Sequence, residues 1–151
     1  MKNMKRQIAL ILLLISSLTY GQSLSEKEII GIWKVEKISG DFPKMPANQQ
    51  KKMDALKAAF LKSSFEFKED RTFNFNIDFM QELDEMMRNV HWKLNSNKTE
   101  IIIQEWKDKD TDKYQLMGIN VSIRNGKVYF IMTESPFILE MKKTSYNNGY
   151  K

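Results

Sequence analysis

The chain has 151 residues, a formal net charge of +5 at pH 7 and no cysteine. A chain of this length fits one ordinary domain. The absence of cysteine excludes disulfide bonds, thiolate metal sites and catalysis by a thiol. The basic residues form small clusters rather than a stripe, so we expect no nucleic-acid partner.

Residues 1–21 have the organisation of a secretory signal peptide. A basic segment, Met1–Arg6, precedes the continuously apolar Ile8–Ile15 and the small, polar Ser16–Gln22. The apolar stretch is shorter than the roughly 20 residues that span a membrane, so we expect no stable membrane anchor. Cleavage before Gln22 removes three positive charges and lowers the formal net charge from +5 to +2. Because no cysteine follows the leader, we expect a periplasmic or secreted protein and not a lipoprotein.

A short helix and a strand are expected directly after the leader. Ser25–Glu28 has the pattern of a capping box, with serine at the N-cap and glutamate three residues later. Ile29–Ile38 predicts the first strand, and the two prolines of Gly40–Pro46 end it.

Ala47–Lys62 predicts an amphipathic helix, because it is rich in helix formers and contains no glycine, proline or β-branched residue. Its apolar side chains recur at helical spacing in one stripe formed by Met53, Leu56, Ala59 and Phe60. The helix has two interpretations. It is either a lid or lipid-contacting basic surface, or a helix that stabilises one end of the fold, and we favour the second.

Strict alternation of aromatic and polar residues predicts an antiparallel hairpin in the next segment. Phe65 and Phe67 lie on one side of the turn at Glu69–Arg71. The second strand continues the alternation at Phe73, Phe75, Ile77 and Phe79. Such a pattern is typical of strands with one buried face.

The later strands are separated by short turns. Met80–Arg88 has helical spacing and predicts a helical turn or a structured loop. The remaining expected strands are Asn89–Leu94, Thr99–Trp106, Lys113–Arg124, Lys127–Thr133 and Phe137–Lys142. Asn125-Gly126 is typical of a two-residue hairpin turn. Two registers remain open for Lys113–Arg124, in which Met117, Ile119, Val121 and Ile123 compete with Tyr114 and Leu116 for the inner face.

These elements predict an all-β fold of eight antiparallel strands with one amphipathic helix inserted after the first strand. Sequential hairpins favour an up-and-down order, and closure into a barrel removes exposed edges. A barrel of eight strands is just wide enough to be filled by side chains or to hold one small ligand. We assign this barrel to residues 22–143 and a flexible C-terminal tail to residues 144–151.

Gly31-Ile32-Trp33, at the start of the first strand, resembles the signature of the lipocalins. The segment Phe65–Phe73 is similar to the second hairpin of bacterial secreted lipocalin-like domains, which have a calycin-type barrel. Trp92–Leu94 and Ile101–Ile103 extend this similarity. The resemblance implies a barrel that binds small, mostly apolar molecules outside the cytoplasm.

The resemblance also implies structural roles for four residues. In the lipocalin family the tryptophan of the Gly-x-Trp signature, here Trp33, closes the base of the barrel. A basic side chain from late in the chain covers it, and Lys142 and Lys143 are the matching candidates for this cation–π contact. The chain departs from the family pattern at Arg71, where the turn usually has glycine. It departs again at Thr111–Tyr114, which resembles the family's Thr-Asp-Tyr motif but precedes the sixth strand rather than the seventh.

The expected ligand-binding residues are those that the alternation places inside the barrel. They are Phe73, Phe75, Ile77, Phe79, Trp92, Phe130 and Met132. Methionines in the insertions suit an adaptable apolar entrance. The alternative is a barrel filled by its own aromatic side chains, whose outer face contacts an unknown protein partner.

No pattern predicts catalysis, a metal site or a cofactor. His91, the only histidine, is expected on the outer, exposed face of its strand, without a second histidine to share a metal. Asp108, Asp110 and Asp112 begin like a calcium loop, but Lys113 stands where glycine is needed. Nucleophile, base and orienting group do not occur in a recognised motif, so we expect a binding protein and not an enzyme.

Overall fold

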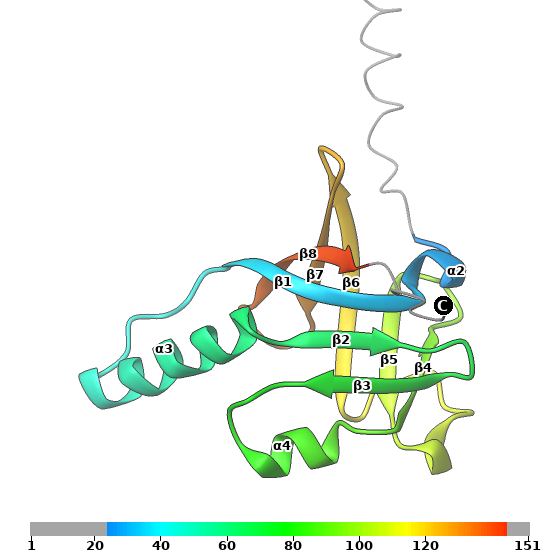
Figure 1. Cartoon of the computed structure of the whole chain (residues 1–151), viewed down its shortest axis with the longest axis horizontal. Coiled ribbons are helices and arrows are strands. Elements are labelled where there is room, and N and C mark those ends of the chain that lie inside the picture. The colour runs from blue at the N-terminus through cyan, green and yellow to red at the C-terminus, as the bar shows by residue number, and fades with distance from the viewer. Residues whose placement is uncertain (1–23, 145–151) are drawn as a thin grey trace, which may run out of the picture.

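The computed structural model describes residues 24–144, which form a closed barrel of eight antiparallel strands in the order β1 to β8 (Figure 1). The expected all-β, up-and-down fold is therefore confirmed, including a helix after the first strand. The signal peptide expected at residues 1–21 and most of the expected tail lie outside the described residues. Thr144, which we assigned to the tail, is the last residue of β8.

Twelve elements make up the described part of the chain. They are α2 (Glu26–Ile29), β1 (Gly31–Ser39), α3 (Ala47–Leu61), β2 (Ser64–Phe67), β3 (Thr72–Asn76), α4 (Gln81–Met86), β4 (Val90–Leu94), β5 (Glu100–Gln104), the 3₁₀ helix η2 (Trp106–Asp108), β6 (Met117–Arg124), β7 (Lys127–Met132) and β8 (Ile138–Thr144).

The aromatic hairpin has the expected pairing. Phe65 pairs with Phe75 and Phe67 with Phe73 across β2 and β3, and all four side chains are buried. Because side chains alternate between the two faces of a strand, the polar partners face outward. The pattern ends with β3 at Asn76, three residues before the expected end at Phe79.

β6 begins at Met117, four residues later than expected. The amide groups of Gln115 and Leu116 both donate to the Ile103 carbonyl, at 3.3 and 3.1 Å. Because the two amides share one acceptor, the chain is still turning at residues 115–116 and regular strand pairing has not yet begun. Ile119 is fully buried, whereas Gly118 lies on the other face. The register that places Ile119 inside is therefore the one adopted.

The two ends of the barrel differ. The end that we call the base carries α2 and the β2–β3, β4–β5 and β6–β7 turns. At the other end, the mouth, long connections carry α3, α4 and η2 (Figure 1). No helix within residues 24–144 is long and apolar enough to cross a membrane.

Candidate functional site

The interior of the barrel contains a network of aromatic rings. Phe65 lies at its centre, with ring centroids 4.6 Å from Phe75, 5.7 Å from Phe130 and 6.2 Å from Phe73. Further ring contacts extend the network to seven residues. They are Trp33, Phe65, Phe67, Phe73, Phe75, Trp92 and Phe130. None of these side chains is more than 4% exposed. Rings at these distances are in contact, so side chains fill the middle of the barrel.

The expected ligand-binding residues do not all belong to this network. Phe73, Phe75, Trp92 and Phe130 are members of it, and Ile77 and Met132 are buried in the same core. Phe79 is 36% exposed, so the expectation that it faces inward was wrong. The reason is that β3 ends at Asn76 and the chain turns towards α4, which breaks the alternation.

The mouth is covered by aromatic side chains from two connections, β1–β2 and β7–β8. Phe60, at the end of α3, stacks on Phe137 with centroids 4.7 Å apart and lies 5.5 Å from Phe75. Phe42 meets Phe137 edge to face, and the Lys57 amine lies 3.7 Å from the centre of the Phe42 ring. These contacts close the mouth over the interior network.

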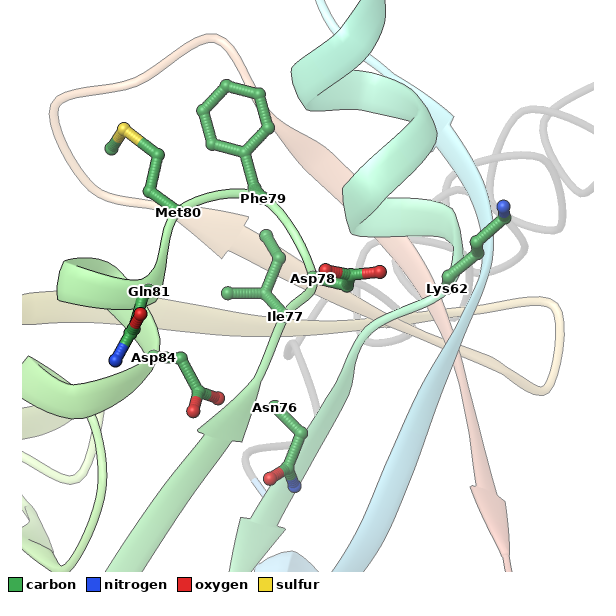
Figure 2. Close-up of a pocket in the computed structure, with 8 residues that line it drawn as sticks. All are labelled: Lys62, Asn76, Ile77, Asp78, Phe79, Met80, Gln81 and Asp84. Atoms are coloured by element: carbon green, nitrogen blue, oxygen red, sulfur yellow. The ribbon is translucent and has the colours of Figure 1, made fainter.

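A shallow cleft of about 460 Å³ lies outside this cover, between the end of α3 and the loop before α4 (Figure 2). Its lining is mixed and consists of Lys62, Asn76, Ile77, Asp78, Phe79, Met80, Gln81 and Asp84. Figure 2 shows Phe79 and Met80 projecting from the loop, while Asp78 points towards the end of α3. Two of the lining side chains, Phe79 and Met80, are large, apolar and exposed.

At the base, Trp33 is held by the short helix and by the last strand. Its indole N–H donates to the Ile29 carbonyl at 2.8 Å. The Lys143 amine lies 5.4 Å from the ring centre and donates to the Glu28 carbonyl at 2.7 Å. Burial lowers the pKa of Lys143. Of the two candidates, Lys143 covers Trp33, whereas Lys142 is exposed and faces Glu36 at 3.5 Å.

Gly31 is required for this arrangement on two grounds. Its φ of +136° is one that residues with a side chain rarely adopt. A Cβ atom there would lie 2.6 Å from the Cε atom of Lys143, which is too close. The glycine therefore provides the space through which Lys143 reaches the base.

Arg71 connects the β2–β3 turn to α2, a role that the sequence did not indicate. Its guanidinium lies 2.6 Å from the Glu26 carboxylate and 5.0 Å from the centre of the Trp92 ring. The hydrogen bond from Arg71 lowers the pKa of Glu26. The residue that departs from the family pattern thus forms a second cation–π contact at the base.

A narrow slot of about 280 Å³ also lies at the base. Its lining is mainly apolar in the interior and polar at the rim, and consists of Leu24, Ile29, Leu94, Lys98, Thr99, Ile101, Asn120, Val121 and Ser122. The slot opens where β5 and β6 separate, because their pairing ends at Glu100 and Asn120.

His91 is only 6% exposed, so the expectation of an exposed histidine was wrong. The residue does lie on the outer face of β4, but the indole of Trp106 covers it edge-on at 4.8 Å. The ring nitrogen Nδ1 is 3.3 Å from the Gln104 amide, whose oxygen accepts a hydrogen bond from Thr111. Burial is the main cause that lowers the pKa of His91.

The connection between β5 and β6 forms this cover by folding back across the outer face of β4 and β5. Asp112 accepts hydrogen bonds from the Ser96 amide and hydroxyl at 2.9 and 2.6 Å. These bonds fasten the connection to the β4–β5 turn. Within residues 24–144, no three side chains of metal-binding type come together.

Two side chains with the chemistry of a general acid or base, Tyr114 and Glu105, have structural partners. A hydrogen bond with the Glu134 carboxylate raises the pKa of Tyr114 to about 12. Glu105 is exposed and forms an ion pair with Lys107 at 2.6 Å. Each of the two groups therefore has a local partner.

The fold defines the protein as a closed, eight-stranded, up-and-down antiparallel barrel, consistent with the calycin-like class. Comparison with protein-family models, with curated proteins and with solved structures gave no match.

Proposed function

We propose that this protein is an exported, lipocalin-like barrel that acts by contacting a protein partner with its outer surface, and that it has no catalytic activity. The observation that carries this proposal is the network of seven aromatic rings in the interior. A ligand inside the barrel would have to displace these rings from one another and expose the apolar surface that stabilises the fold.

The leader supports the proposed location outside the cytoplasm. Residues 1–21 combine a basic start, an apolar centre and a small polar end. Without a cysteine after this segment, lipid attachment is not available. We therefore propose a periplasmic or secreted protein that is released from its leader before Gln22.

The second candidate function is the binding of a small apolar ligand, with which the barrel fold is compatible. The cleft of about 460 Å³ at the mouth favours it, because exposed Phe79 and Met80 line this cleft. Adaptable methionine side chains are typical of surfaces that accept varied apolar molecules. Such a ligand would bind at the mouth rather than inside the barrel.

A lipophilic fluorescent probe distinguishes the two functions. N-phenyl-1-naphthylamine gains fluorescence when it enters an apolar site, and fatty acids displace it. We expect no saturable gain with the purified protein, but a stable complex with a partner from the same cell envelope, detected by native mass spectrometry. Saturable uptake that a fatty acid reverses, without any protein complex, would contradict the interaction function and favour the small-ligand function.

A further inference from the structure

The β6 strand is longer than its neighbour at the base of the barrel. Its pairing with β5 ends at Asn120, whereas its pairing with β7 continues to Arg124. Among the described strands, none pairs with residues 121–124 on the side of β5. Figure 1 shows the β6–β7 hairpin extending beyond the other strands. A strand edge of this kind presents backbone donors and acceptors that another chain can pair with.

The slot lies directly beside this free edge. Lys98 and Thr99 form one side of it, and Val121 and Ser122 form the other. Its apolar walls come from Leu24, Ile29, Leu94 and Ile101. A volume of about 280 Å³ accommodates one large apolar side chain together with part of its backbone. The edge and the slot therefore form one continuous site.

Two basic side chains lie beside this site. Lys98 lies at the rim of the slot, and Arg124 ends the free edge, with its Nε atom 3.2 Å from the Ser122 hydroxyl. No ion pair joins either of them to a carboxylate within the part of the chain that the structure describes. The nearby carboxylates have other hydrogen-bond partners: Arg71 binds Glu26, which Lys98 attracts only through space, and the Thr133 hydroxyl donates to Glu100 at 2.7 Å.

We propose that the base of the barrel binds an extended, acidic segment of a partner protein as an added strand along residues 121–124. One apolar side chain of the segment occupies the slot, and acidic side chains on either side of it meet Lys98 and Arg124. Backbone pairing supplies affinity and the slot supplies selectivity, as in other cases of strand addition. A small amphiphile in the slot would leave the strand edge unpaired, so a peptide satisfies more of the site. This inference rests on the proposed interaction function and names the class of partner.

The test is a titration of the ¹⁵N-labelled protein followed by NMR. The probe is a blocked acidic pentapeptide, acetyl-EVLVE-amide, and the control peptides are acetyl-KVLVK-amide and an acidic peptide with N-methylated backbone amides. We expect saturable shifts of the amide signals of residues 98–99 and 121–124 with the first peptide alone. The N-methylated peptide keeps the side chains but lacks backbone donors, so equal binding by it would overturn strand addition.

Charge reversal tests the role of the two cations. In the Lys98→Glu, Arg124→Glu double variant, binding of the acidic peptide should weaken by about tenfold or more and the basic peptide should be preferred. Lys52→Glu, an exposed change on α3, is the matched control and should leave binding unchanged. An unchanged preference in the double variant would overturn the charge assignment, and absence of shifts at residues 121–124 would overturn the site.

These outcomes are separable from those of the proposed function. If no peptide shifts the edge residues, but the protein still excludes the lipophilic probe and forms a partner complex, the inference fails alone. If the probe binds saturably, a fatty acid displaces it and no partner complex forms, the interaction function itself fails.

Discussion

Trp33 and Trp106 show how differently two tryptophans contribute to one small barrel. Trp33 is 4% exposed, donates to the Ile29 carbonyl and contacts Phe130 with centroids 5.4 Å apart. Trp106 is 43% exposed and lies on the outer face, over His91. The first residue therefore joins α2, β1 and the interior, whereas the second covers a local polar group.

The same substitution at the two positions should have unequal effects. Trp33→Ala removes a buried ring and its hydrogen bond, so we expect it to lower the free energy of unfolding by about 3–5 kcal/mol. Trp106→Ala removes a half-exposed ring and its exposed hydrogen bond to the Asn89 carbonyl, and should cost less, on the order of 1 kcal/mol. Urea denaturation of both variants measures the difference. Equal losses would show that Trp33 does not have the structural role that we assign to it.

His91 should make stability depend on pH. Burial lowers its pKa in the folded protein, with smaller contributions from Lys93, Arg71 and Lys109 that outweigh the opposite effect of Asp110. The unfolded chain, with a histidine pKa of about 6.5, therefore takes up the proton more readily than the folded protein does. The stability that neutral His91 provides is complete above pH 6.5 and decreases as the pH falls through the lower pKa of the folded state.

The His91→Gln variant isolates this effect. Glutamine retains a group that can hydrogen-bond with Gln104 but does not titrate. Between pH 7.5 and 5.5, we expect the melting temperature of the wild-type protein to fall more than that of the variant. Parallel curves for the two proteins would mean that the burial of His91 has no influence on stability in this range.

At the scale of elements, α3 is attached to the barrel mainly through its last turn. Ala59 and Phe60 are its buried residues, and Met53 and Leu56 are partly buried against the core. The stripe that the sequence predicts therefore faces the barrel. Figure 1 shows the other end of α3 projecting away from the strands.

Phe60 should consequently control the docking of α3. In Phe60→Ala the stacking on Phe137 is lost, and the helix should separate from the mouth more often. We expect trypsin to cleave this variant faster after Lys51, Lys52 and Lys57. Leu61→Ala, which changes an exposed neighbour, is the matched control and should be cleaved at the wild-type rate. If both variants are cleaved equally fast, the attachment of α3 does not depend on Phe60.

The predictable part of the fold is the part that local alternation encodes. Phe65, Phe67, Phe73 and Phe75 alternate with polar residues, and each is buried in the structure. The burial of His91 was not predictable, because the residues that cover it belong to a connection 15 or more positions later and no period marks them. The choice between Lys142 and Lys143 likewise depends on the register of β8 against β1, which is a long-range property.

At the scale of the whole molecule, the sequence predicted which residues lie inside the barrel better than it predicted whether they fill the interior or line a cavity. Eight strands allow either a filled interior or a small cavity, and the choice depends on how the rings meet in three dimensions. The nine phenylalanines made a filled barrel possible. The contacts between rings show that the interior is filled. The candidate sites therefore lie outside the interior, at the mouth cleft and at the slot of the base.

Removal of one central ring should create a ligand-binding cavity in the filled barrel. Phe130 is fully buried and contacts Trp33, Phe65 and Phe67, so Phe130→Ala should leave an apolar cavity and cost about 3–5 kcal/mol of stability. Dry apolar cavities of this kind bind benzene or xenon. We expect benzene to raise the melting temperature of Phe130→Ala but not of the wild-type protein or of Phe79→Ala, which truncates a ring at the mouth cleft. Stabilisation of the wild-type protein by benzene to the same degree would show that its interior already contains space, and the role of a filled interaction module would then have to be abandoned.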